Sequence, residues 1–319
     1  MCLFFSFLSL NRKAKTRDSN IKIQLKKIKS TKKHIVPELA KPVRLQEYGV
    51  GVFNSALTKS ALKKALKKQY ITINGTIATT ATFIHGGETL CLNHPEAIKP
   101  AKKFNFLLQV RYEDDHFAIV HKPPGILVSG NSFKTMARAL NQNLEQSGLI
   151  DATAPQPVHR LDYETTGLLL VGKTSGCIRA FNKMFENKII KKKYYAITIG
   201  QMKPQGAITA KIDGKKSRST YKVEASVFSK RFGQLNLAQL KPSTGRRHQL
   251  RKHLASIGNP ILGDKKYGID HLILNGKGLY LHAYSLKFRH PYTNEEVKVH
   301  DPFPQKFIKI FEQLQSIKT

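Results

Sequence analysis

Apolar and polar residues alternate along residues 59–92 in a pattern that predicts one short helix followed by a small sheet. Residues 59–68 (KSALKKALKK) have helical spacing, with an apolar stripe and a basic stripe. The apolar stripe consists of Ala61, Leu62, Ala65 and Leu66. The basic stripe consists of Lys63, Lys64, Lys67 and Lys68. Two short β-prone runs then flank Asn74-Gly75, a pair that tolerates positive φ and predicts a tight hairpin. After a Gly-Gly turn, residues 89–92 (TLCL) are expected to form a third strand, so residues 41–95 are predicted to be a small α/β domain.

From Phe106 onward, runs typical of strands outnumber those typical of helices. One segment, residues 177–190 (CIRAFNKMFENKII), has helical spacing. The strand-like runs are residues 117–125 (FAIVHKPPG), 167–173 (GLLLVGK), 194–200 (YYAITIG), 219–228 (STYKVEASVF), 234–240 (QLNLAQL) and 279–288 (LYLHAYSLKF). Because strands mostly follow strands, residues 106–319 are predicted to form an α+β domain with a mixed, largely antiparallel sheet and flanking helices.

The segments outside these two domains are polar or basic. Residues 11–36 contain ten Lys and Arg and one acid, Asp18, so residues 1–40 are predicted to be a disordered basic tail. Such a tail is either an arm that grips RNA or a solubilising leader. Residues 96–105 are predicted to be a linker. The first ten residues are apolar, but no basic stretch precedes them, and they are too short to span a bilayer.

Charge indicates the class of partner. The chain has 54 Lys and Arg against 21 Asp and Glu, a formal net charge of +33, which favours a polyanion such as nucleic acid. A membrane surface is less favoured, because no long helix has a broad apolar face opposite a basic one. The three cysteines, Cys2, Cys91 and Cys177, are widely separated, which argues against disulfides or a zinc module and for the reducing cytoplasm.

Residues 167–174 (GLLLVGKT) match the phosphate-loop pattern of nucleotide-binding proteins. That mechanism requires the residues between the glycines to form a loop, whereas these are three leucines and a valine that favour a buried strand. We therefore expect neither an NTPase nor a nucleotide cofactor.

Asp162 stands out because it lies just before a predicted buried strand in a chain with few acids. A carboxylate there should be partly desolvated, which is costly unless a cation accompanies it. Taken alone, Asp162 could equally be a structural residue that caps a turn.

Residues 243–254 (STGRRHQLRKHL) are expected to form a helix with Thr244 as its N-cap. Leu250, Leu254 and Ile257 form its buried stripe, with Arg251 at the edge, where its planar fork could pair with a buried carboxylate. His248 and His253 are five residues apart, so they do not share a helix face and are not expected to bind a metal together.

Tyr194 and Tyr195 enter a predicted strand and should point to opposite faces, so that only one of them can line a given pocket. A tyrosine ring there could stack on a base, and its hydroxyl could exchange a proton. A tyrosine buried in the core is the alternative.

These segments, in this order, closely resemble the RluA-like branch of pseudouridine synthases. The resemblance rests on HRLD at residues 159–162 followed by Thr-Gly and an aliphatic run, on KKYYA at 192–196, and on TGRRHQLRKHL continuing to PILGDKKYG at 244–268. KPPG at residues 122–125 and LHA at 281–283 also fit. In addition, residues 43–92 resemble the S-four RNA-binding domain, although a small packing domain with a solvated lysine face remains the alternative.

The resemblance implies roles for the matching residues. Asp162 would be the catalytic aspartate, Tyr194 would stack on the uracil and help remove a proton, and Arg251 would pair with Asp162. Arg160 would help fill the gap left by a flipped nucleotide. The positions expected to bind substrate are Arg160, His159, Arg246, His248, Lys63, Lys64 and Lys67.

The implied activity is the isomerisation of uridine to pseudouridine in structured RNA, in rRNA in preference to tRNA. The uridine would be flipped out of its stack. Because the reaction is an isomerisation, we expect no metal and no cofactor, and we expect a cytoplasmic monomer with no membrane partner. The alternative is an RNA-binding protein without activity, such as a ribosome-assembly factor. An intact set of Asp162, Tyr194 and Arg251 favours the enzyme.

Overall fold

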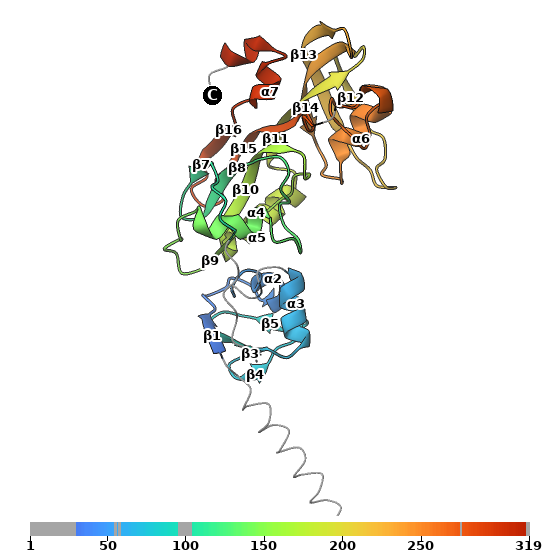
Figure 1. Ribbon diagram of the computed structural model, residues 1–319. Coiled ribbons are helices and arrows are strands. Elements are labelled where there is room, and N and C mark those ends of the chain that lie inside the picture. The colour runs from blue at the N-terminus through green and yellow to red at the C-terminus, as the bar shows by residue number, and fades with distance from the viewer. Residues whose placement is uncertain (1–29, 54–55, 57–58, 95–103, 275, 317–319) are drawn as a thin grey trace, which may run out of the picture. The chain divides into compact units, whose positions relative to one another are not determined.

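The chain forms two compact units, residues 1–102 and residues 103–319 (Figure 1). The computed structural model describes residues 30–53, 56, 59–94, 104–274 and 276–316. The first 29 residues of the predicted tail and most of the predicted linker lie outside these ranges. Within the described ranges, no helix has both the length and the apolar character needed to cross a membrane.

The small unit is built on a four-stranded sheet with strand order β1-β6-β3-β4 and a separate β2-β5 pair. Its elements are β1 (Ser30–Ile35), β2 (Val43–Arg44), α2 (Leu45–Tyr48), α3 (Lys59–Lys67), β3 (Ile71–Ile73), β4 (Thr76–Ile77), β5 (Phe83–Ile84) and β6 (Thr89–His94). Leu62 and Leu66 of α3 are buried in the core of this unit, and Lys63, Lys64 and Lys67 are exposed. The amphipathic helix is thus confirmed.

The hairpin and the third strand of the small unit are also confirmed. Asn74 and Gly75 have φ values of 46° and 85° between β3 and β4, which is the paired positive-φ geometry of a tight hairpin turn. The expected disorder was wrong for residues 30–35, which form β1 and pair antiparallel with β6. The pattern of this segment did not predict the strand, because its partner lies about sixty residues further along the chain.

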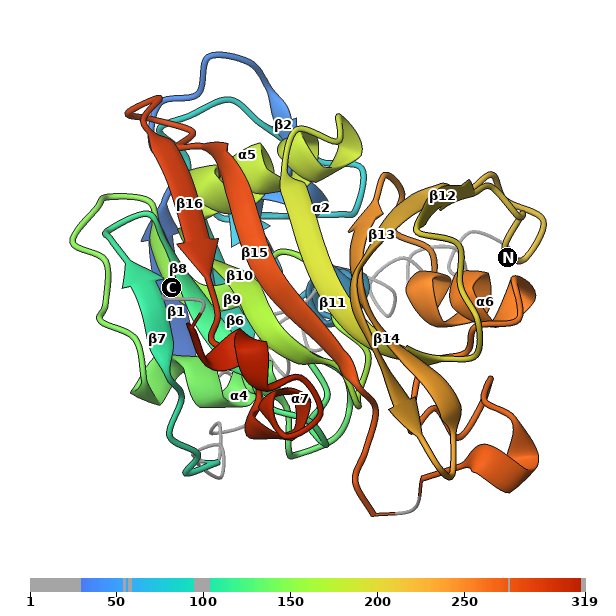
Figure 2. The same cartoon turned by 90° about the horizontal axis from the view of Figure 1, so that it is seen from above.

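The large unit contains a ten-stranded sheet whose main path is β12-β13-β14-β11-β15-β10-β8-β7, with β9 beside β10 and β16 beside β15 (Figure 2). The strands are β7 (Val110–Glu113), β8 (Phe117–Lys122), β9 (Ala152–Pro157), β10 (Thr166–Thr174), β11 (Lys191–Ile199), β12 (Gln205–Ile208), β13 (Ser219–Ser229), β14 (Gly233–Pro242), β15 (Leu281–Arg289) and β16 (Glu296–His300). Only β10 and β15 pair in parallel among these strands, which confirms a mixed, largely antiparallel sheet.

Short helices cover parts of this sheet. They are α4 (Met136–Ala139), α5 (Ser175–Glu186), α6 (Gln249–Ser256), α7 (Gln305–Ile308) and the 3-10 turns Leu140–Gln142, Asp270–Leu272 and Glu312–Ser316. Figure 2 shows α6 beside β12 to β14, whereas α4 and α5 lie in the half of the unit that contains β8 to β10. The predicted helix over residues 177–190 ends earlier, at Glu186, because Lys188 turns to a φ of 58° and Ile190 then packs beneath the sheet.

All nine residues of β10 are buried, which confirms a strand and not a phosphate loop at residues 167–174. The first two residues of β10 pair in parallel with β15. A Cβ atom on Gly167, whose φ is 111°, would lie 2.3 Å from the carbonyl oxygen of Ala283. A side chain at this position would push the two parallel strands apart. Glycine therefore lets β10 start against β15, immediately after the segment that carries Asp162.

Candidate active site

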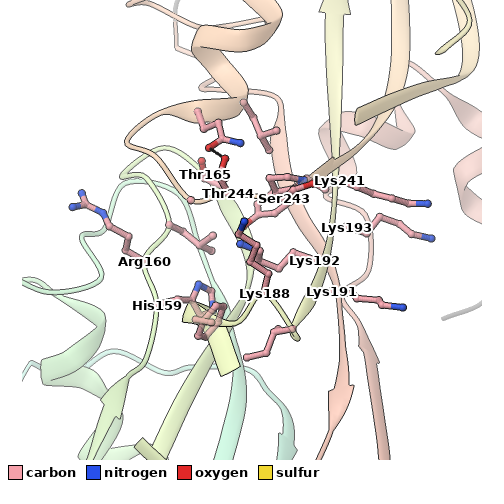
Figure 3. A pocket seen from close by; sticks show the side chains of 18 of the residues that line it. His159, Arg160, Thr165, Lys188, Lys191, Lys192, Lys193, Lys241, Ser243 and Thr244 are labelled. Atoms are coloured by element: carbon pink, nitrogen blue, oxygen red, sulfur yellow. Dashed lines mark hydrogen bonds between the residues drawn. The ribbon is translucent and has the colours of Figure 1, made fainter. Parts of the chain in front are cut away.

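A cavity of about 1120 Å³ opens in the large unit and collects most of the predicted site residues of this unit (Figure 3). Those that line it are Asp162, Tyr194, Arg160, His159, Arg246 and His248. Its volume exceeds the ~300–1,000 Å³ of ordinary small-molecule pockets, so it has room for more than one nucleotide unit. Segments far apart in the sequence, at residues 158–165, 188–194 and 241–250, form its walls.

The loop that carries Asp162 is held by a buried lysine. Lys122, at the end of β8, donates from Nζ to the carbonyl oxygens of Pro123, Tyr163 and Thr165 at 3.0, 3.1 and 2.8 Å. Burial lowers the pKa of Lys122 to about 8, and the charge of Asp162 partly opposes that shift. Lys122 therefore joins the KPPG segment to the residues that directly follow Asp162. The motif pointed to these residues but not to this role.

The Asp162 side chain is 16% exposed, and the His248 imidazole lies close to it. His248 Nε2 lies 3.8 Å from Asp162 Oδ1, and His248 Nδ1 lies 2.9 Å from the hydroxyl of Tyr267. The pKa of His248 is below its ordinary value because burial outweighs the charge of Asp162. The hydrogen bond between Nδ1 and the Tyr267 hydroxyl fixes the orientation of the imidazole ring, so that Nε2 faces the Asp162 carboxylate.

Tyr194 and Tyr195 point to opposite faces of β11, as predicted. Tyr195 packs against the rings of Tyr284 and Phe303, at centroid distances of 5.1 and 5.0 Å, whereas Tyr194 lines the cavity. Burial raises the pKa of the Tyr194 phenol, and the charge of Asp162 raises it further. Tyr194 therefore keeps its proton at neutral pH, which suits it to stacking and to donating a hydrogen bond.

Arg251 does not pair with Asp162, so that predicted ion pair was wrong. Its Nε and Nη2 atoms donate to Asp264 Oδ2 and Oδ1 at 2.8 and 2.7 Å, and Nη2 lies 3.3 Å from Glu164 Oε2. Arg251 and Asp264 are 5% and 1% exposed. Arg251 lies on the buried side of α6, where the two oxygens of Asp264 occupy its planar fork in the bidentate geometry.

Asp264 links Arg251 to the cavity indirectly. Its Oδ1 also accepts from the backbone N–H groups of Lys266 and Tyr267, at 2.9 and 3.1 Å. The same tyrosine hydroxyl contacts His248, which faces Asp162. Arg251 thus stabilises the loop that orients His248.

Two further expectations for the segment around α6 were wrong. The helix begins at Gln249 with His248 as its N-cap at a φ of 53°, and Thr244 is not the cap. The Thr244 hydroxyl accepts a hydrogen bond from Arg218 N and donates one to Gln249 Oε1, so it does not cap the backbone N–H groups at the start of α6. Ile257 is 38% exposed and follows the last turn instead of completing the buried stripe.

Three comparisons with known proteins bear on this arrangement. The family model described as RNA pseudouridylate synthase matches residues 116–256. The chain is 30% identical over 302 residues to "Ribosomal large subunit pseudouridine synthase C" of Rickettsia prowazekii (strain Madrid E), covering 84% of this chain and 96% of that protein. The chain belongs to the RluA-like family of pseudouridine synthases. It is therefore an isomerase that converts uridine to pseudouridine in RNA.

Another relative of this synthase is "Ribosomal large subunit pseudouridine synthase D" of Vibrio cholerae serotype O1 (strain ATCC 39315 / El Tor Inaba N16961), 29% identical over 79% of this chain and 86% of that protein. Solved structures confirm the fold. Human RNA Pseudouridylate Synthase Domain Containing 1 superimposes with a TM-score of 0.52 at 22% identity, over 69% of this chain and 98% of that one. Human RNA Pseudouridylate Synthase Domain Containing 4 does so with a TM-score of 0.50 at 24% identity, over 65% and 93%.

The remaining predicted site residues of the synthase, His159, Arg160 and Arg246, differ in burial and in their hydrogen bonds. His159 accepts a hydrogen bond at Nε2 from Leu170 N at 2.9 Å, and burial, with the charge of Lys192, lowers its pKa to about 3. It is a neutral ring that ties the Asp162 segment to β10. Arg160 and Arg246 are exposed at the rim, and Arg246 Nε donates to the carbonyl of Lys216 at 3.2 Å.

Sequence reasoning missed four residues that support the Asp162 site of the synthase, namely Lys122, Glu164, Asp264 and Tyr267. Asp264 and Tyr267 stand in the GDKKYG run that helped to establish the resemblance, but nothing in the pattern named their partners. His253, on α6, contacts Ser217 and Ser219 away from His248. No cluster of three His, Cys, Asp or Glu suited to a metal ion occurs within the described ranges.

Proposed function

We propose that this synthase modifies uridines of large-subunit ribosomal RNA, with Asp162 as its catalytic carboxylate. The observation that carries the proposal is that Asp162 and Tyr194, from separate segments, line one cavity of about 1120 Å³, which has room for more than one nucleotide unit. The relatives named as ribosomal large subunit synthases favour rRNA over tRNA as the substrate.

The chemistry needs a carboxylate close to a uridine that has left its stack. The bond between N1 of uracil and C1′ of ribose breaks, the base turns, and C5 bonds to C1′ while the hydrogen of C5 is lost and N1 gains a proton. Asp162 either attacks covalently or removes a proton from the sugar, and both routes use its ionised form. Every heavy atom of the product comes from the substrate, so the reaction consumes no nucleotide or redox partner.

The other residues of the cavity would hold the flipped nucleotide. Tyr194 offers a ring face to the uracil, and such stacking on an aromatic side chain contributes about 1–3 kcal/mol per base. Arg160, exposed beside the Asp162 loop, would take the place of the flipped nucleotide in the RNA. His248, whose Nε2 faces Asp162, would help to orient the carboxylate and the flipped nucleotide.

The small unit would act as an RNA-binding domain of the S-four type, over residues 41–95, beside a catalytic domain over residues 106–319. Its support is the exposed basic stripe of α3 beside a hairpin. We place the protein in the cytoplasm as a monomer.

Replacing the basic stripe of the small unit should weaken RNA binding without unfolding the protein. In K63Q/K64Q/K67Q, the slope of log affinity against log salt should fall by about two to three, because each lost phosphate contact removes about 0.7–0.9. Filter binding across a salt series would measure this slope. The control K203Q/K230Q/K309Q removes the same charge from exposed positions of the large unit that do not line the cavity. Equal slopes for the two variants would make α3 a solvated packing helix.

Mapping of pseudouridines in cells with and without this protein would test the substrate. We expect specific pseudouridines of the large-subunit rRNA to disappear when the protein is absent and to return with the intact chain. Loss confined to tRNA would contradict the rRNA assignment, and no loss in any RNA would contradict the proposed activity in this chain.

A further inference from the structure

The register of three strands places lysines directly opposite one another on one face of the large sheet. Lys191 of β11 is opposite Lys287 of β15, and Lys287 is opposite Lys298 of β16. Residues directly opposite in an antiparallel pair share a face, with Cβ atoms about 4.5–5.5 Å apart, and like charges there are destabilising. Lys193, two residues after Lys191, points to the same face, and Figure 3 shows Lys241 pointing the same way. We call these five residues the lysine face.

The charges of the lysine face are mostly uncompensated. Lys287 pairs with Glu296 at 2.8 Å, but Lys191, Lys193 and Lys298 form no ion pair with a carboxylate in the described part of the chain. Partial burial and the charges of Lys241 and Lys298 lower the pKa of Lys193, only partly offset by Glu224. Repulsion of this kind on a folded surface is relieved when an anion binds there.

Packing on the opposite face of the same strands explains why the lysine side chains are directed away from the core. Leu286 and Phe288 of β15 and Val297 of β16 are buried with Phe181 of α5. Because side chains alternate along a strand, packing against α5 directs Lys287 and Lys298 away from that core.

The lysine face is continuous with the cavity that contains Asp162. All five lysines line that cavity, as do Ser285 of β15 and His300 of β16. In Figure 3, Arg160 points to one side of the cavity, and Lys191, Lys193 and Lys241 point to the other. A polyanion whose uridine enters at Asp162 can therefore continue onto this face without leaving the surface.

We propose that the lysine face binds the phosphates of the RNA strand that flanks the modified uridine. This inference rests on the proposed function, because it needs the uridine to bind at Asp162. The row of three opposed lysines spans three strands about 4.8 Å apart, so it contacts phosphates as an electrostatic track and reads no bases. RNA is favoured over a membrane because the lysines line the cavity that contains Asp162 and do not surround a flat apolar surface.

The test compares two variants of the full chain with equal charge changes. K191Q/K287Q/K298Q should bind a long RNA substrate about 10–100-fold more weakly, with a salt slope lower by about two. The control K203Q/K230Q/K309Q removes three exposed lysines that do not line the cavity. It should show little of this loss. Melting of both variants would report folding, and the lysine-face variant should not melt lower, because like-charge repulsion is relieved.

Several results would overturn the proposal. Equal losses in both variants would mean that only net charge matters, and no loss in either would mean that RNA does not reach this face. Unchanged RNA affinity with lost sedimentation on phosphatidylserine vesicles would assign the face to a membrane. The proposed function fails separately, because it predicts that Asp162→Asn is inactive on every RNA. An active Asp162→Asn beside a weakened lysine-face variant would leave the face as an RNA contact and remove Asp162 as the catalyst.

Discussion

Asp162→Asn should abolish pseudouridine formation while RNA binding stays nearly intact. The substitution preserves size and hydrogen bonding, but an amide can neither attack nor accept a proton at neutral pH. We expect the single-turnover rate to fall on the order of 10⁴-fold or more. Affinity should change little, because phosphate contacts dominate it. The measurement is a single-turnover assay on rRNA fragments that lack the modification, with binding measured in parallel.

The matched control for this prediction is Asp115→Asn, the same substitution at an exposed turn of the same unit. It should keep full activity. Joint loss of binding and turnover in Asp162→Asn would indicate a structural role for the carboxylate. Retained turnover would remove Asp162 from the chemistry and would favour an RNA-binding protein that has kept the fold.

Arg251→Met should destabilise the large unit and thereby lower activity. Asp264, 1% exposed, would lose its bidentate partner and remain as an uncompensated buried carboxylate. Breaking a buried pair in this way costs about 3–5 kcal/mol of unfolding free energy, which lowers the melting temperature on the order of 10 °C for a unit of this size. Arg251→Lys should recover only part of this, because an ammonium lacks the planar fork. Calorimetric or circular-dichroism melting would measure the effect.

A double variant separates stability from positioning at this pair. Arg251→Met with Asp264→Leu removes both charges, so its melting temperature should be above that of Arg251→Met alone. Its activity should stay low, because the backbone of Tyr267 would lose its hydrogen bond to Asp264. The Tyr267 hydroxyl would then no longer hold His248 in place. Arg251→Met with normal melting but no turnover would instead mean that Arg251 pairs with Asp162 when RNA is bound. Normal melting and normal turnover would leave Arg251 without a role.

Local patterns were sufficient wherever the determining contacts are close in sequence. The run of three leucines and a valine made β10 a strand and excluded a phosphate loop, since four consecutive branched apolar side chains favour burial in a sheet. Asn74-Gly75 determined a hairpin because both residues adopt positive φ. Alternation along β11 was enough to separate Tyr194 from Tyr195.

Patterns were insufficient where the contacts join distant segments. The β1 strand exists because β6 pairs with it, and the basic residues of this segment form no pattern that predicts a strand partner. Likewise, the helix cap at Thr244 was a reasonable prediction from residue type, but Arg218 and Gln249 occupy its hydroxyl, and His248 takes the cap position.

By itself, the sequence determined the fold class, the RNA-modifying family and the motifs that meet in the cavity, because each depends on residue order and local periodicity. The tertiary structure alone decided which carboxylate Arg251 pairs with. Asp264, Glu164 and Asp162 all belong to motifs that the fold brings together near Arg251, and only the folded chain shows that Asp264 takes the bidentate position. It also decided that Lys191 lies opposite Lys287, because strand register sets which residues are opposite and no local pattern encodes the register between β11 and β15, which are nearly a hundred residues apart.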